Sequence, residues 1–325
     1  MKILVTGGFG NVGHAIIHEL LERSHEVRVF ELKNTKTLNQ ARKYGRKIEV
    51  YWGNILDPES IKSALNGIDV VIHLAGIIPP LSEANKKLCQ RVNVGGTKNL
   101  IDEIQNNTNK PPIIFTSSAT VIGPTQDQNP PIDPYTTPNP KTNYTQSKVD
   151  AEKLLQQSNL PHCICRFGAV LSTFIVGRFS LLKEAFEMPL DNRVEMVLDL
   201  DLAVALANAA ELLISGDTLN GKILNIGGGK DFQRYARNLT QDLFEIMGIG
   251  SFDEDCYTTE DYYLDWLDTS ESQSLLQYQN HSFDEAMKIF LKPYKKLKPL
   301  MWTVSPILRL IFENQSPYKD SKANA

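Results

Sequence analysis

The stretch TGGFGNVG, residues 6–13, is a glycine-rich segment near the start of this chain. It follows a short apolar run, ILV at residues 3–5, and precedes a segment whose apolar residues recur at helical spacing. At such a strand-to-helix junction Gly7 would permit a tight turn, Gly10 would let the backbone approach a pyrophosphate, and Gly13 would let helix and strand pack closely. A glycine-rich turn without a ligand would look the same, so the rest of the chain has to decide.

Apolar runs and helical patterns alternate over the first half of the chain. Strands are expected at residues 2–6, 26–31, 47–52, 69–75 and 112–119, and helices at 11–22, 35–43, 58–65 and 83–105. Strands of nearly continuous apolar content, separated by helices, indicate parallel pairing with both faces covered. We therefore expect an α/β fold, a doubly wound parallel sheet of the Rossmann type, with ligands at the carboxyl ends of its strands.

Bulk composition favours small-molecule chemistry. A net charge of −4 gives no reason to expect nucleic acid, which needs a clustered basic surface. No apolar run approaches the ~18 residues of a membrane span, and a first strand beginning at residue 2 leaves no room for a signal peptide, so we expect a cytoplasmic protein. His14 and His18 lie one helical turn apart without an evident third ligand, so no metal is expected. Four cysteines lack zinc or redox spacing and are expected as buried thiols: Cys89, Cys163, Cys165 and Cys256.

An acidic residue ends the second expected strand. Glu31 follows Gly13 by eighteen residues, where a carboxylate can accept hydrogen bonds from the adenosine ribose. It would also repel a 2′-phosphate, so NAD is favoured over NADP, although the nearby Lys33 works against this preference. The alternative is that Glu31 is a solvated strand end.

Six motifs, in this order, resemble the extended short-chain dehydrogenases/reductases, the group that contains NAD-dependent epimerases and dehydratases. They are TGGFGNVG, GNILD at 53–57, HLAG at 73–76, NVGGTKNL at 93–100, TSSATVIG at 116–123 and YTQSK at 144–148. The resemblance covers residues 1–170 well and the remainder loosely. It implies NAD as cofactor, with NADP less favoured.

The resemblance also implies the cofactor site. Asn54 and Ile55 would flank the adenine, and residues 74–76 would line the path to the nicotinamide ribose. The family usually has Asp where Asn54 stands, and an amide keeps the acceptor oxygen without the charge. The full set of expected cofactor residues is Gly7, Gly10, Asn11, Val12, Gly13, Glu31, Asn54, Ile55, Leu74, Ala75, Gly76, Asn93, Tyr144 and Lys148.

The expected catalytic residues are Ser118, Tyr144 and Lys148. Residues four apart on a helix share a face, so the Lys148 ammonium can lie beside the Tyr144 phenol. A tyrosine of ordinary pKa ~10 is a poor base at neutral pH, but a neighbouring lysine and a positively charged nicotinamide both favour the phenolate. Ser118, at a strand end, is placed to hydrogen-bond the substrate oxygen. By the resemblance, Lys148 also holds the nicotinamide ribose.

The reaction follows from the same resemblance. Sugar-nucleotide dehydratases carry Thr-Asp-Glu where this chain has residues 118–120 (SAT), so SSATV resembles the epimerases more closely. Ile122 replaces a tyrosine that is common in the family. We expect an NAD-dependent epimerase/dehydratase-type enzyme that transfers hydride at a hydroxylated carbon, with a (nucleotide-)sugar as a possible substrate. The alternatives are an NAD(P)-dependent carbonyl reductase or alcohol dehydrogenase of the same family, and a non-catalytic NAD(P)-sensing regulatory protein.

The second half is expected to form a substrate lobe. We expect a dinucleotide-binding domain at 1–170, the lobe at 171–313 with some segments returning to the first domain, and a disordered polar tail at 314–325. Val194 stands where family epimerases grip a diphosphate with arginine, and Arg193 is one residue away, on the other side of a strand. By the resemblance, residues 223–229 close the lobe. Residues 253–268 are expected as a solvated acidic face with aromatic anchors, or alternatively a site for a cation, and residues 300–312 as a packing or lid segment. A homodimer through the helices at 83–106 and 144–158 would resemble the family.

Overall fold

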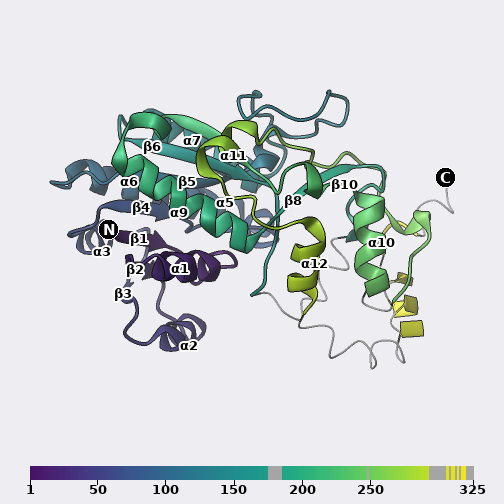
Figure 1. Ribbon diagram of the computed structural model, residues 1–325, viewed down its shortest axis with the longest axis horizontal. Coiled ribbons are helices and arrows are strands. Elements are labelled where there is room, and N and C mark those ends of the chain that lie inside the picture. The colour runs from purple at the N-terminus through teal and green to yellow at the C-terminus, as the bar shows by residue number, and fades with distance from the viewer. Residues whose placement is uncertain are drawn as a thin grey trace.

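A seven-stranded parallel sheet forms the centre of the molecule (Figure 1). The computed structural model describes residues 1–174, 185–246, 249–292, 305–306, 309–311, 313–314 and 316–319. The strands lie in the order β3-β2-β1-β4-β5-β6-β9 and are all parallel. Their bounds are β1 Lys2–Thr6, β2 Glu26–Glu31, β3 Glu49–Trp52, β4 Val70–His73, β5 Ile113–Ser118, β6 His162–Phe167 and β9 Lys222–Ile226. This confirms the predicted fold class.

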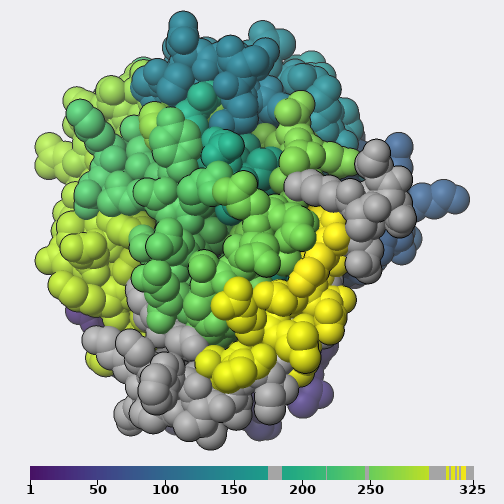
Figure 2. All heavy atoms as spheres, turned by 90° about the vertical axis from the view of Figure 1, so that its right-hand side faces the viewer, coloured from purple at the N-terminus to yellow at the C-terminus, as the bar shows by residue number. Residues whose placement is uncertain are grey.

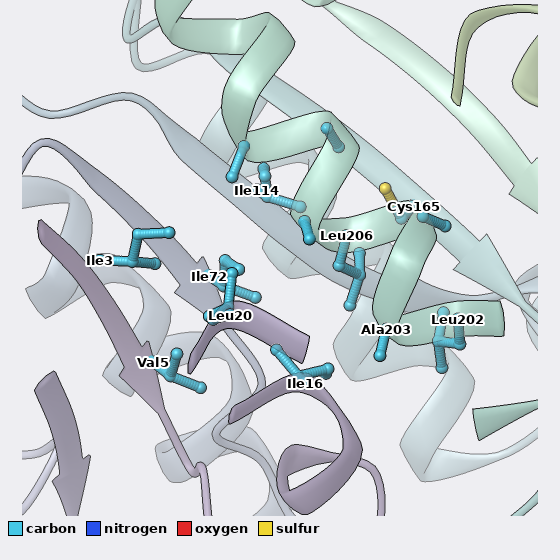
Figure 3. Packing of buried hydrophobic residues seen from close by; sticks show 14 of the residues in the cluster. Ile3, Val5, Ile16, Leu20, Ile72, Ile114, Cys165, Leu202, Ala203 and Leu206 are labelled. Carbon is cyan, nitrogen blue, oxygen red and sulfur yellow. The ribbon is translucent and has the colours of Figure 1, made fainter. Parts of the chain in front are cut away.

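Helices cover both faces of the sheet. One face carries α1 (Gly13–Glu22) and α9 (Asp199–Ser215), and the other carries α3 (Pro58–Ala64), α6 (Gly96–Asn106) and α7 (Asn143–Gln156). The helix α2 (Thr35–Tyr44) follows β2 at the edge of the sheet. In Figure 3 the α1 residues Ile16 and Leu20 and the α9 residues Leu202 and Leu206 pack over the β-strands. Each of these four side chains is fully buried, and such burial stabilises a fold by about 1.5–3 kcal/mol per side chain.

A second, three-stranded sheet supports the C-terminal lobe. Its strands are β7 (Ala169–Leu171), β8 (Arg193–Leu198) and β10 (Gln233–Tyr235), with β8 in the middle. The helices α10 (Ala236–Ile246) and α12 (Phe283–Leu291) pack against it, while α11 (Ser270–Leu276) contacts α9 and β9 of the main domain. In Figure 1 this lobe lies to the right of the main sheet.

The strand β9 corrects the expectation that residues 223–229 close the lobe. β9 pairs with β6 and is the last strand of the main sheet. Leu224 and Ile226 point to the same face of the sheet and are buried in the core that α9 covers. The segment therefore belongs to the first domain. The glycines 227–229 then lead towards the lobe.

The expected long helix over 83–105 is wrong. The structure has α4 (Leu81–Ala84), α5 (Lys86–Cys89), the π-helical turn η1 (Gln90–Gly95) and then α6. Asn85 has a non-helical backbone (φ −142°, ψ 79°), and its side chain accepts a hydrogen bond from the Leu88 N–H to start α5. A π-turn inserts an extra residue into a helix and often marks a functional site.

The C-terminal residues that the structure describes lie on the lobe (Figure 2). The Ser316 hydroxyl is buried and donates to the Cys256 carbonyl at 2.6 Å, so this part of the expected tail has a fixed contact. Most of the stretch 300–312 and residues 320–325 lie outside the described residues. All four cysteines are buried, unpaired thiols, as predicted. In the described part of the chain no helix is long and apolar enough to cross a bilayer.

Candidate active site

The glycine loop joins β1 to α1 through three close backbone contacts. Gly7 has φ +70°, and a Cβ there would lie 2.7 Å from the Ala75 Cα. A Cβ on Gly13 would lie 2.2 Å from the Gly8 carbonyl oxygen, so the first turn of α1 rests on the loop itself. The glycine that packs against β2 is instead Gly8, where a Cβ would lie 3.0 Å from the Val29 side chain. The sequence did not single out Gly8. A Cβ on Gly10 would meet only the Gly7 carbonyl, and the exposed face of Gly10 is open to a ligand.

The Glu31 carboxylate reaches the glycine loop from the end of β2. It accepts hydrogen bonds from the Phe9 N–H at 3.2 Å and from the Leu32 N–H at 3.0 Å. Burial raises the pKa of Glu31, while these hydrogen bonds and the charge of Lys36 oppose the rise. Glu31 thus supports the glycine loop, and its carboxylate still has lone pairs available.

Glu31→Ala is expected to weaken NAD binding about tenfold and to narrow the difference between NAD and NADP affinities. A hydrogen bond to a charged group contributes about 1.5–3 kcal/mol, and 1.4 kcal/mol is a factor of ten. Calorimetric titration with both nucleotides measures the effect. Glu26→Ala, at the opposite end of β2, is the matched control. Unchanged affinities in Glu31→Ala would mean that Glu31 is only a strand end.

The two residues expected at the adenine are oriented by local contacts. The Asn54 side-chain oxygen accepts from the Leu56 N–H at 3.0 Å and so closes its own turn. The Ile55 side chain points inward and packs on Gly96 of α6, where a Cβ would lie 2.6 Å from it. The outward surface at this position is therefore the Asn54 side chain and the backbone of Ile55.

Asn93 holds the loop after β4 rather than facing outward. Its amide oxygen accepts from the Ile77 N–H at 2.7 Å, and its amide nitrogen donates to the Ile77 carbonyl at 2.9 Å and to Ser147 at 2.9 Å. The side chain is buried in the π-helical turn. Asn93 therefore holds the segment around Gly76 and Ile77 against α7. Both polar atoms of its side chain are used in these hydrogen bonds. This is a different use from the direct cofactor contact that was expected.

The segment 74–76 is held by β1 and lies next to Lys148. The Leu74 N–H donates to the Thr6 carbonyl at 3.1 Å, and the Ala75 N–H donates to the Thr6 hydroxyl at 3.2 Å. A Cβ on Gly76 would lie 3.9 Å from Lys148 Nζ. His73 beneath them bonds Thr6 and Thr97, and burial lowers its pKa to about 3, so it is a neutral structural group.

Helix α7 brings Tyr144 and Lys148 to this edge of the sheet. Thr142 caps the helix with a hydrogen bond from the Thr145 N–H, and the Glu83 carboxylate of α4 accepts from the N–H groups of Asn143 and Tyr144. These partners satisfy backbone donors that a helix start otherwise leaves open. The capping pattern TNYT was visible in the sequence, whereas Glu83 carried no local signal.

Ser118, Tyr144 and Lys148 come together as predicted. Lys148 Nζ donates to the Thr116 carbonyl at 2.8 Å and lies 5.9 Å from the centre of the Tyr144 ring. The Ser118 hydroxyl shares a 2.7 Å hydrogen bond with the Thr120 hydroxyl and also interacts with the Tyr144 phenol. A hydroxyl, a phenol and an ammonium thus converge at the carboxyl end of β5, next to segment 74–76.

Without a bound nicotinamide, the neighbouring Lys148 does not bring the Tyr144 pKa into a useful range. Burial raises the pKa of Tyr144 to about 12, and the interaction with Ser118 only opposes this rise. Burial also lowers the pKa of Lys148 to about 8, against the charge of Glu152 and the Cys89 thiol. Lys148 is buried, Tyr144 is half-buried, and the ammonium donates to the Thr116 carbonyl, so desolvation outweighs the effect of the two groups on each other. A further positive charge near the phenol is needed to lower its pKa.

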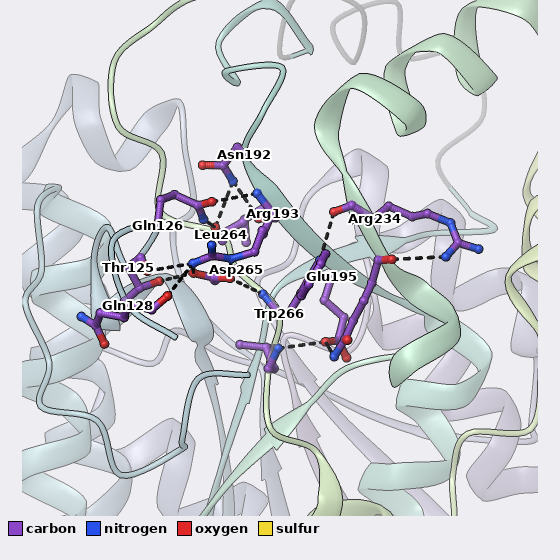
Figure 4. A network of polar contacts seen from close by, with 12 residues as sticks. Thr125, Gln126, Gln128, Asn192, Arg193, Glu195, Arg234, Leu264, Asp265 and Trp266 are labelled. Carbon is purple, nitrogen blue, oxygen red and sulfur yellow. Dashed lines mark hydrogen bonds and ion pairs between the residues drawn. The ribbon is translucent and has the colours of Figure 1, made fainter. Parts of the chain in front are cut away.

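Arg193 is committed to the lobe itself (Figure 4). It donates to both Asp265 carboxylate oxygens at 2.7 and 3.0 Å, and to the carbonyls of Thr125 and Gln128. Val194 turns to the other side of β8 and is buried in the lobe core, as strand alternation predicts. The arginine nearest to the expected diphosphate grip is therefore neutralised by a buried carboxylate.

The stretch 253–268 is more deeply buried in the lobe than the expected solvated acidic face would be. Asp265 is buried against Arg193, and the Trp266 indole donates to the Arg234 carbonyl at 3.1 Å. The Leu267 N–H donates to the buried carboxylate of Glu195, whose pKa burial raises to about 7 (Figure 4). In the described residues no group of three or more His, Cys, Asp or Glu side chains could hold a metal.

A doubly wound parallel sheet, a glycine loop after its first strand and a Ser-Tyr-Lys cluster at its carboxyl edge define an extended short-chain dehydrogenase/reductase. The chain belongs to the 3-beta hydroxysteroid dehydrogenase/isomerase family, whose sequence profile matches residues 4–172. The family prediction made from the motifs is thereby confirmed.

Individual relatives agree with this assignment over parts of the chain. The mouse (Mus musculus) protein named 3 beta-hydroxysteroid dehydrogenase type 7 is 36% identical over 125 residues, which cover 37% of this chain and 33% of that protein. A 3-beta-hydroxysteroid dehydrogenase of Mycolicibacterium neoaurum is 29% identical over 259 residues, covering 72% of this chain and 67% of the relative. The chain thus spans about a third of the mouse relative that it matches.

A solved structure shares the fold over nearly the whole chain. It is the UDP-glucuronic acid 4-epimerase of Bacillus cereus in complex with NAD, with a TM-score of 0.74 and 22% identity. The comparison covers 92% of this chain and all of the epimerase chain. At this identity the likeness establishes the architecture of both the sheet and the lobe.

Proposed function

We propose that this protein is an NAD-dependent dehydrogenase that oxidises a hydroxyl group on an uncharged, largely apolar substrate of the hydroxysteroid kind. The observation that carries the proposal is the convergence of Ser118, Tyr144 and Lys148 at the carboxyl end of β5, beside segment 74–76. The names of the relatives, 3-beta-hydroxysteroid dehydrogenases, support the choice of substrate class.

The residues present fit NAD. The open face of Gly10 and the start of α1 at Gly13 would hold the pyrophosphate, Glu31 the adenosine ribose, and Lys148 the nicotinamide ribose. NAD supplies the hydride acceptor when it is bound. Its positive nicotinamide also provides the additional charge that Tyr144 needs for its pKa to fall from about 12 towards neutrality.

Tyr144 then acts as the base. The Ser118 hydroxyl holds the substrate oxygen, and Tyr144 Oη removes the hydroxyl proton as the carbon gives up its hydride. Lys148 stabilises the phenolate from the same helix face. Lys148 is buried, and low exposure to water strengthens its electrostatic effect on the phenolate.

Surfaces around Tyr144 support an apolar substrate. Leu81 is the first residue of α4, which packs against α7, and Ile78 lies three residues before it. The Ile78 and Leu81 side chains are 43% and 50% exposed. Arg193, the cation that a diphosphate would need, is already paired with Asp265.

Turnover with a substrate panel tests the proposal. The purified protein is incubated with NAD and, separately, a 3β-hydroxysteroid, UDP-glucose and UDP-glucuronic acid, with NADH absorbance and product chromatography as readouts. Steady NADH formation with the steroid alone is expected. Epimerised sugar without net NADH would establish the epimerase instead, and nucleotide binding without any turnover would establish the sensing protein.

Cellular location and assembly are also part of the proposal. We place the protein in the cytoplasm, because four buried, unpaired thiols suit a reducing compartment. We also propose a homodimer through the helices at 83–106 and 144–158, whose test is the molar mass in solution.

A further inference from the structure

A buried carboxylate lies one helical turn beyond the catalytic lysine. Glu152 of α7 is 3% exposed and accepts hydrogen bonds from Arg166 Nε at 2.9 Å and Arg166 Nη2 at 2.6 Å. Arg166 of β6 is 2% exposed, and its remaining terminal nitrogen donates to the Pro134 carbonyl at 2.7 Å. Such a pair is fully desolvated, so a change in either partner is felt by its neighbours.

The same carboxylate holds the end of β5. The Ser117 hydroxyl donates to Glu152 Oε1 at 2.5 Å. Ser117 stands between Thr116, whose carbonyl accepts from Lys148 Nζ, and Ser118, which faces Tyr144. One side chain therefore ties α7 and β6 to the strand end that carries two groups of the active site.

Glu152 is also the carboxylate whose charge acts on Lys148. The groups around Lys148 are Tyr144 and Glu152 on α7, Cys89 on α5 and His73 on β4, with Arg166 on β6 behind Glu152. His73 is neutral, since burial holds its pKa at about 3. Burial lowers the pKa of Lys148 to about 8, and Glu152 is the first of the groups that oppose this.

We propose that Glu152, held by Arg166 and Ser117, is a positioning residue for the dehydrogenase reaction, keeping the Lys148 ammonium charged and the end of β5 in place. This inference rests on the proposed function. Glu152 itself touches none of the reacting groups, and it acts through Lys148, Thr116 and Ser118.

The pH profile of kcat/KM tests the charge. Glu152→Gln keeps an acceptor for Ser117 but leaves the Arg166 charge unbalanced, so Lys148 loses its proton at a lower pH. The alkaline limb of the profile is expected to shift to lower pH by about one unit, with kcat reduced and KM little changed. Arg166→Met leaves the Glu152 charge unbalanced and moves the same limb upward. The double variant E152Q/R166M returns the limb to its wild-type position.

Ser117→Ala separates the effect of the Glu152 charge from its effect on the position of β5. This variant removes the hydrogen bond between β5 and Glu152 but keeps both charges, so kcat falls while the alkaline limb of the pH profile stays at the same pH. Glu49→Gln is the matched control, because Glu49 pairs with the buried Arg28 on β2, outside the active site, and its profile should not change.

Opposite shifts in the two single variants are the decisive result, because a merely structural role would not produce them. If one single variant does not fold, the sign of the shift in the other decides. If the wild type turns over its substrate and the limb stays fixed in the folded variants, this inference is overturned and the proposed function stands. If the wild type turns over no substrate, the proposed function falls, and this inference falls with it.

Discussion

Tyr144→Phe is expected to lower kcat about a thousandfold while NAD binding stays within a factor of two or three, because general acid–base catalysis contributes about 10²–10⁴-fold. The substitution removes one oxygen and keeps the ring that packs beside Lys148. The ring position, the cap of α7 and the Glu83 contacts involve backbone or carbon atoms, so the fold should be retained. Stopped-flow or steady-state NADH formation gives kcat, and calorimetry gives the nucleotide affinity.

A matched control for the loss of a phenol is available on the surface. Tyr135 is 57% exposed on the loop before α7, and Tyr135→Phe should leave kcat unchanged. If Tyr144→Phe retained most of the wild-type kcat, Tyr144 would not be the base, and the mechanism proposed above would be wrong.

Gly13→Ala is expected to damage both the fold and nucleotide binding. Its Cβ would lie 2.2 Å from the Gly8 carbonyl oxygen and 2.5 Å from the Gly8 carbonyl carbon, both backbone atoms that cannot swing aside. Forcing one methyl group into such a contact costs about 2 kcal/mol, and the displaced loop should bind NAD about a hundredfold more weakly. Denaturant unfolding and calorimetry measure the two effects.

Two other glycines serve as controls. A Cβ on Gly216 meets nothing within 4 Å and its φ of 173° is extended, so Gly216→Ala should change neither property. Gly10→Ala meets only the Gly7 carbonyl, at 3.1 Å, but its methyl group would stand on the open face of the loop. That variant should keep its stability and lose nucleotide affinity. If all three variants had the same stability and the same NAD affinity, the glycine loop would not be the nucleotide-binding loop.

Much of the main sheet could be predicted because its strands are buried on both faces. The expected strands 2–6 and 26–31 coincide with β1 and β2, and the other three differ from the structure by one or two residues at their ends. Continuous apolar runs leave little choice of secondary structure. The position of β9 could not be predicted in the same way, because its place beside β6 depends on packing with α9, far away in the sequence.

Within the site, local spacing predicted what lies on one element and missed what depends on contacts between elements. Tyr144 and Lys148 share a helix, and the glycine loop is contiguous, so both were found. The π-helical turn at Gln90–Gly95 includes Asn93, whose side chain bonds Ile77 of another segment. Arg193 is paired with Asp265, 72 residues away. The pKa of Tyr144 depends on burial, which spacing on a helix does not report.

The central claim is that this chain is an NAD-dependent dehydrogenase built around the loop TGGFGNVG and Tyr144. The most direct test is calorimetric titration of the purified wild-type protein with NAD, NADH, NADP and NADPH in turn. We predict one binding site for NAD and NADH. The affinities for NADP and NADPH should be weaker by about tenfold or more, because Glu31 repels their 2′-phosphate. Binding of none of the four would mean that the loop is only a turn between β1 and α1, and the proposed function would be contradicted.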